Sequence, residues 1–123
     1  MSAMTNDPAA AASRGFHVES RHEADGALIV TCVGRLVYEN APMLRDEIRK
    51  WIPTQKRIVL DLKEVPSMDS SGLGAIAGLY VSGRTHGCKI EMINSNKAVR
   101  DLFSMSNLLA LFEPTGRYVN RMP

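Results

Sequence analysis

Hydrophobic residues near the amino terminus fall in two short runs that a turn separates. The runs are 16–22 and 27–33, and Asp25-Gly26 lies between them. An Asp-Gly pair between two runs rich in β-branched residues is a strong signal for a β-hairpin. The pattern therefore predicts two antiparallel strands, the second of which ends at Gly34.

The next apolar positions have helical spacing: Met43, Leu44, Ile48, Trp51 and Ile52. We expect a loop over residues 35–40, after which the Asn40 side chain caps this helix. Pro42 fits its first turn, where the missing N–H costs nothing, and Pro53 ends it.

A continuous apolar run at 57–62 predicts a central strand that is covered on both faces. After a loop at 63–69, the period becomes helical from Ser71, because one stripe contains Leu73, Ile76, Ala77 and Tyr80. Gly87 suits the left-handed residue that ends many helices.

The remaining pattern predicts a strand at 89–93, a turn with a capping residue at 94–96 and a third helix, followed by a further helical turn at 108–112. The third helix is marked by Val99, Leu102, Phe103 and Met105. The order is therefore β-β-α-β-α-β-α-(α). A helix between two strands requires a right-handed crossover and a parallel pair, so the fold class is mixed α/β, an amino-terminal hairpin joined to βαβ units.

Composition narrows the function classes. The chain has 123 residues, enough for one domain, and its 15 basic and 13 acidic residues are scattered, so we expect no nucleic-acid partner. Cys32 and Cys88 have neither zinc nor redox spacing and are predicted to be buried free thiols. Residues 1–14 are Ala-rich and polar without the pattern of a secretory signal, and no apolar run approaches the ~20 residues that span a bilayer. We expect a disordered tail at 1–14, a cytoplasmic location and no membrane contact.

The segment Asp69-Ser70-Ser71-Gly72 lies where a strand leads through a loop into a helix. Ligands and partners of open α/β sheets bind at such places. The N–H groups at a helix start lack intrahelical partners, and together with the helix dipole they suit a phosphoryl group. In the alternative interpretation, Ser70 and Ser71 only cap the helix, and the nearby glycines serve close packing.

Enzyme motifs are incomplete around this segment. No lysine follows the glycines as a P-loop requires, Met68 or Asp69 replaces the first glycine of GxSxG, and Gly72-Leu73-Gly74 supplies only GxGxxA. The three histidines, which are His17, His22 and His86, supply neither a catalytic base nor a metal site. We therefore expect no catalysis, no metal and no cofactor.

A run of residues resembles the STAS domain (sulphate transporter and anti-sigma factor antagonist), in its antagonist branch. It consists of the strand 59–62, a seven-residue loop that ends in Asp69, and then Ser70-Ser71-Gly72-Leu73-Gly74. The resemblance covers roughly residues 17–112 and implies a STAS domain at 15–118. Gly34 and Gly87 lie where the family has glycines.

This resemblance implies a phosphorylation switch that regulates transcription. Antagonists of the family bind an anti-sigma factor that is also an ATP-dependent serine kinase, and so release a sigma factor. The kinase phosphorylates the residue equivalent to Ser71, the complex dissociates, and a serine phosphatase restores the active form. We expect a monomer or weak dimer.

The resemblance also implies a partner surface around Ser71. In the family, the loop 35–39 adjoins the switch loop, and it is either a partner-selecting surface or an ordinary loop. The expected partner-binding residues are Asp69, Ser70, Gly72, Leu73, Gly74, Arg35, Leu36 and Tyr38. The alternative function is a structural STAS module of a stress-signalling scaffold or lipid-transport complex, and a serine hydrolase is disfavoured because no base accompanies the serine.

Overall fold

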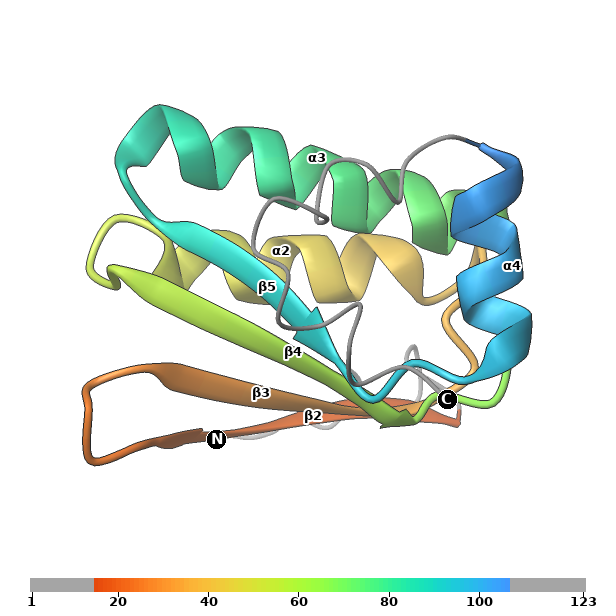
Figure 1. The fold of residues 1–123 in the computed structure, drawn as a ribbon, viewed down its shortest axis with the longest axis horizontal. Coiled ribbons are helices and arrows are strands. Elements are labelled where there is room, and N and C mark those ends of the chain that lie inside the picture. Colours follow the sequence, from red (N-terminus) through yellow and green to blue (C-terminus); the bar gives the residue numbers. More distant parts are fainter. Residues whose placement is uncertain (1–14, 107–123) are drawn as a thin grey trace.

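The computed structural model describes residues 15–106 of the chain (Figure 1). The strands are β2 (Phe16–His22), β3 (Leu28–Gly34), β4 (Arg57–Glu64) and β5 (Lys89–Ile93). The helices are α2 (Ala41–Trp51), α3 (Ser70–His86) and α4 (Lys97–Met105). The order predicted from the sequence is confirmed up to α4. The expected helical turn at 108–112 and the expected tail at 1–14 lie outside the described residues.

The amino-terminal hairpin forms as predicted, with β2 antiparallel to β3. Its second strand begins at Leu28, one residue later than expected, because the Ala27 N–H bonds within the turn to Asp25 Oδ1 at 2.9 Å. Gly34 ends the strand with φ of 113°. A Cβ at this glycine would lie 1.7 Å from the Gly15 carbonyl oxygen, so no larger residue fits here.

The sheet has the order β2-β3-β4-β5, and both pairs after the hairpin are parallel. Helices α2 and α3 make the two crossovers and lie side by side over one face of the sheet (Figure 1). The core beneath them is formed by the hydrophobic residues of that sheet face, together with Phe103 of α4. The fully buried members from strands and helices include Leu60, Met92, Leu44 and Ile76.

Strand β4 is central and is buried on both faces, as its continuous hydrophobicity predicts. Leu60 belongs to the core under the helices. Val59 points to the opposite face, where it packs with Ala27, Ile29 and Ile93 and is 2% exposed. All three described helices contribute to the core that contains Leu60, and none of them contributes to the small cluster around Val59. The two faces of the sheet are therefore covered differently.

The prediction that the Asn40 side chain caps α2 was wrong. Asn40 precedes α2, but its side chain makes no capping bond, and its Nδ2 donates instead to the Arg35 carbonyl at 2.7 Å. Its backbone is already helical, with ψ of −20°, and the N–H groups of Asn40 and Ala41 bond to the Val37 carbonyl. A helical backbone at this position turns the side chain away from the helix N–H groups, because a capping residue needs an extended conformation.

The ends of the other elements follow the sequence signals. Helix α2 stops before Pro53, and Gly87 ends α3 with φ of 74° in the left-handed region. Cys32 and Cys88 are free and buried. Burial raises the pKa of the Cys32 thiol to about 12 and also raises the pKa of Cys88, so both thiols are protonated and unreactive at neutral pH.

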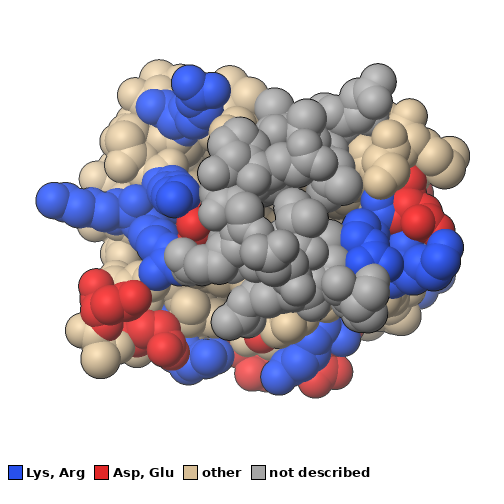
Figure 2. Space-filling model, in the orientation of Figure 1, with Lys and Arg blue, Asp and Glu red and all other residues tan. Residues whose placement is uncertain are grey.

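The hydropathy, possible metal ligands and charges of the described part of the chain add three observations. Within residues 15–106, none of the helices is long and apolar enough to cross a membrane. The same residues contain no group of three or more His, Cys, Asp or Glu side chains that could hold a metal ion. In the view of Figure 2, basic and acidic side chains lie next to each other at the right edge and towards the lower left, rather than in one large patch of a single sign.

Candidate functional site

The start of α3 is capped by an acidic side chain and not by a serine. Asp69 has extended backbone, and its Oδ1 accepts the N–H groups of Ser71 at 2.9 Å and Gly72 at 3.1 Å. Ser70 and Ser71 are the first two residues of the helix itself. The interpretation of these serines as helix caps is therefore wrong, since Asp69 already bonds the N–H groups that a capping hydroxyl would accept.

The same carboxylate joins the start of α3 to the loop before α2. Asp69 Oδ2 accepts the N–H of Tyr38 at 3.0 Å, while the Asp69 N–H donates to the Leu36 carbonyl at 3.3 Å. Leu36 also forms an isolated parallel bridge with Met68, and its N–H donates to the Ser67 carbonyl at 3.0 Å. The two loops thus lie side by side, which confirms the arrangement that the family resemblance implies.

Two glycines of the segment have different reasons to be glycine. At Gly72 a Cβ would lie 2.3 Å from the Leu36 carbonyl oxygen, so the missing side chain permits the close approach of α3 to the neighbouring loop. At Gly74 nothing lies within 4 Å of such a Cβ, and the residue is exposed. Of these two glycines, only Gly72 is required by the packing of the described residues.

Ser71 faces a surface groove between the amino-terminal halves of α2 and α3. The groove has a volume of about 280 Å³, and its described lining comprises Tyr38, Ala41, Pro42, Arg45, Ser71, Gly74 and Ala75. Ser71 is half-buried and Ser70 is exposed. No hydrogen bond of the Ser71 hydroxyl is found within residues 15–106. The hydroxyl therefore stands at the edge of a groove and is not committed to holding the fold.

Helix-start N–H groups are less available to an anion than the sequence suggests. The N–H groups of Ser71 and Gly72 bond to the Asp69 side chain, and the Leu73 N–H bonds to the Asp69 carbonyl at 3.0 Å. A phosphoryl group on Ser71 would meet a carboxylate at this place. Two of the N–H groups expected to receive the phosphate, those of Ser71 and Gly72, are therefore already bonded to the Asp69 side chain.

The predicted partner-binding residues all gather around this corner, but they are not equally accessible. Those at the surface are Arg35, Tyr38, Asp69, Ser70 and Gly74. Leu36 is 0% exposed and Leu73 is 5% exposed, and Gly72 is also buried. Any part that these three residues take in binding is through the loop and the helix that they hold in place, and a contact role for the surface residues stays a prediction.

Sequence reasoning missed Pro42 and Arg45, which line the groove from α2. Pro42 was recognised only as a helix-start residue. No local pattern marks Arg45, because it becomes part of the site only when α2 packs beside α3. The signal that could have found it is its place in the second turn of the helix that follows the loop at 35–40.

The comparisons with known proteins identify the family. The profile of the STAS domain matches residues 20–120 of the chain. The chain belongs to the STAS domain family. This STAS protein is 33% identical over 109 residues to the anti-sigma F factor antagonist of Paenibacillus polymyxa, a match that covers 87% of this chain and 92% of the relative. Membership places the chain among regulatory binding proteins and not among enzymes.

Solved structures share the STAS fold at low sequence identity. An anti-sigma factor antagonist from Mycobacterium paratuberculosis superposes with a TM-score of 0.70 and 21% identity, over 79% of this chain and 82% of that chain. The antagonist SpoIIAA in its unphosphorylated form gives a TM-score of 0.66 at 19% identity, over 78% of this chain and 85% of its own. SpoIIAA has also been solved in a phosphorylated form, with a TM-score of 0.63 at 18% identity, over 78% of this chain and 88% of that chain.

Proposed function

We propose that this STAS protein is an anti-sigma factor antagonist with a phosphorylation switch at Ser71. It binds an anti-sigma factor that is also a serine kinase while the Ser71 hydroxyl is unmodified, and it releases that partner when Ser71 is phosphorylated. A serine phosphatase returns it to the binding form. The binding and release occur in the cytoplasm and regulate transcription through the sigma factor that the partner holds.

The observation that carries this proposal is the position of the Ser71 hydroxyl. It lies at a groove and makes no hydrogen bond within the described residues, while Asp69 performs the capping that a serine would otherwise perform. A hydroxyl without a structural task can be modified without loss of the fold. Ser70, its exposed neighbour, does not line the groove.

In the proposed modification, the kinase supplies ATP and this chain supplies only the nucleophile. The Ser71 Oγ attacks the γ-phosphorus, an O–P bond forms while the bond to ADP breaks, and the hydroxyl proton passes to a base of the kinase. The product carries about −1.5 to −2 additional charge. Beside Asp69, and inside an interface fitted to a neutral hydroxyl, this charge costs repulsion and desolvation, so the complex dissociates.

Two relatives support the proposal by name. The similar protein of Paenibacillus polymyxa is an anti-sigma F factor antagonist. SpoIIAA, whose fold is similar, exists in both unphosphorylated and phosphorylated forms. A switch of the same kind in this chain would need one accessible serine, and Ser71 meets that need.

The test incubates the full chain with its candidate kinase and ATP and maps the phosphorylated residue by mass spectrometry. We expect phosphate on Ser71, none on the Ser71→Ala variant, and unchanged phosphorylation of the matched Ser70→Ala variant. Ser71→Asp should weaken kinase binding at least tenfold while the melting temperature stays the same. Absence of phosphate from Ser71, together with equal kinase binding by wild type and Ser71→Asp, would exclude the switch and favour a structural STAS module.

A further inference from the structure

One cation lines the groove that Ser71 faces. Among the described residues of this groove, Arg45 alone carries a formal charge. Its side chain is 40% exposed, and within residues 15–106 it forms an exposed ion pair with Asp46 Oδ1, which lies 4.0 Å from Nε. Such a long surface ion pair contributes little, so the guanidinium can turn to a stronger partner at small cost.

The other charged groups near Ser71 make the groove, with Arg45, the favourable side for a phosphate. Asp69 holds the helix N–H groups on one side and repels a second negative charge. The Nε of Arg35 donates to Ser67 Oγ at 3.3 Å, and Arg35 does not line the groove. A phosphate on Ser71 would therefore be pushed from Asp69 towards the groove, where Arg45 offers a planar set of donors suited to phosphate oxygens.

We infer that Arg45 receives the phosphoryl group of phosphorylated Ser71 across the groove. The inference rests on the proposed function, because Ser71 must first be phosphorylated. The pairing has a consequence for the partner: the phosphate enters the groove beside Tyr38, which is 76% exposed, and neutralises the one cation of its described lining. The modification would thus occupy part of the groove as well as add charge next to it.

The test measures the second pKa of the phosphate on Ser71 by phosphorus-31 NMR in the full chain. Phosphoserine is incorporated at position 71 during translation, so the sample does not depend on any kinase. Pairing with a cation favours the dianion and lowers the pKa of the phosphate. We expect Arg45→Gln to raise this pKa by about 0.5, the shift that corresponds to an exposed charge pair, and 1 M salt to reduce the difference.

The matched control is Arg49→Gln, one turn further along α2 and exposed outside the described lining of the groove. It should leave the phosphate pKa at the wild-type value. In addition, phosphorylation should shift the Nε proton resonance of Arg45 and not that of Arg49. Equal phosphate pKa values in wild type, Arg45→Gln and Arg49→Gln would overturn the inference. A kinase that fails to modify Ser71 would overturn the proposed function while the pKa difference between these variants could still be measured.

Discussion

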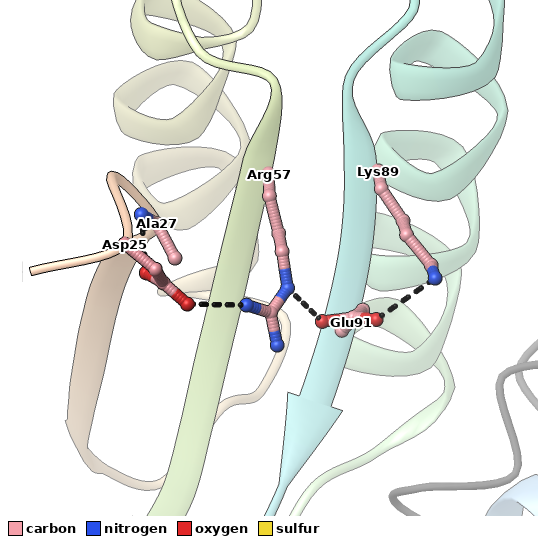
Figure 3. A network of polar contacts seen from close by, with 5 residues as sticks. All are labelled: Asp25, Ala27, Arg57, Lys89 and Glu91. Carbon is pink, nitrogen blue, oxygen red and sulfur yellow. Dashed lines mark hydrogen bonds and ion pairs between the residues drawn. The ribbon is translucent and has the colours of Figure 1, made fainter. Parts of the chain in front are cut away.

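The STAS sheet has one acidic side chain at each end of its parallel strands, and the two are bound in different ways. Beyond the carboxyl end of β4, Asp69 accepts three backbone N–H groups from α3 and from the loop before α2. Near the other end, Glu91 is 0% exposed and lies 2.7 Å from Arg57 Nε and 3.3 Å from Lys89 Nζ (Figure 3). Arg57 also contacts Asp25 at 3.2 Å, which ties the hairpin turn to the same cluster.

The difference lies in what each carboxylate holds in place. Backbone N–H groups belong to the loops themselves, so the bonds of Asp69 fix where two chain segments lie and leave the nearby hydroxyl uncommitted. Glu91 is bound by the side-chain cations of Arg57 and Lys89, which offset the cost of burying its charge. We therefore expect changes at the Glu91 cluster to act on stability, and changes at Asp69 to act on the position of the Ser71 segment.

The largest effect is expected for Arg57→Met. It leaves the buried carboxylate of Glu91 with the exposed ammonium of Lys89, and breaking a buried pair in this way should lower the free energy of unfolding by about 3 kcal/mol. Urea denaturation would measure this loss. The matched Lys89→Met variant should lose under about 1 kcal/mol, because Lys89 is exposed. If the two variants were equally stable, the ion cluster would not be organised by Arg57.

A smaller loss is expected for Gly72→Ala. The new Cβ would meet the Leu36 carbonyl oxygen at 2.3 Å, and such overpacking costs about 2 kcal/mol while it pushes the loop before α2 away from α3. The control Gly74→Ala has open space around its Cβ and should be neutral or gain up to about 1 kcal/mol from the helix propensity of alanine. Thermal unfolding of both variants measures the contrast, and a Gly72→Ala variant as stable as Gly74→Ala would contradict the close approach.

Asp69→Ala removes the cap of α3 and should lower the free energy of unfolding by about 1 to 2 kcal/mol. Its distinctive result is local: amide hydrogen exchange should accelerate at Tyr38, Ser71 and Gly72, the three N–H groups that Asp69 accepts. Asp69→Asn keeps one accepting oxygen and puts an amide donor in place of the other, so it should retain protection either at Ser71 and Gly72 or at Tyr38, and not at both. Unchanged exchange at Tyr38 in the alanine variant would show that the two loops are held together without the carboxylate.

The smallest effect concerns Cys32, in the core between the two ends of the sheet. The pKa of its thiol is raised from 9.0 to about 12 by burial, so the folded state keeps a proton that the unfolded state loses above pH 9. The stability that this supplies is complete below pH 9 and is lost as the pH rises from 9 to 12. Between pH 8 and pH 10, wild type should lose about 1 kcal/mol more than Cys32→Ala. Parallel pH profiles for the two proteins would contradict the shifted pKa.

The sequence supplied most of the fold because its signals were local. Asp25-Gly26 between two β-branched runs is enough for a hairpin, and the continuous run of β4 is enough for a central strand. The candidate segment was found equally early, because it lies between a buried strand and a helix. The choice of Ser71 over Ser70 came from the resemblance to the STAS family and not from spacing.

Partners of polar side chains could not be predicted in the same way. Asn40, Asp69 and the two serines all have side chains that favour helix caps, and sequence alone assigned the capping to Asn40 and, as an alternative, to the serines. In the folded chain the Asn40 amide bonds the Arg35 carbonyl, and Asp69 takes the cap of α3 together with the Tyr38 N–H. Which donor each oxygen finds depends on the loops that packing brings within reach.

By itself, the sequence determined the order of the elements, the helix start that displays Ser71 and the absence of any complete catalytic motif around it. Tertiary structure decided that Asp69 joins the two loops, that Arg45 shares a groove with Ser71, and that Glu91 is buried among cations. The physical reason is range. Hydrophobic period and turn chemistry act between residues a few positions apart. The contacts of Asp69 with Tyr38 and of Glu91 with Arg57 instead join residues 31 and 34 positions apart, which meet only when α2 packs beside α3 and the strands align.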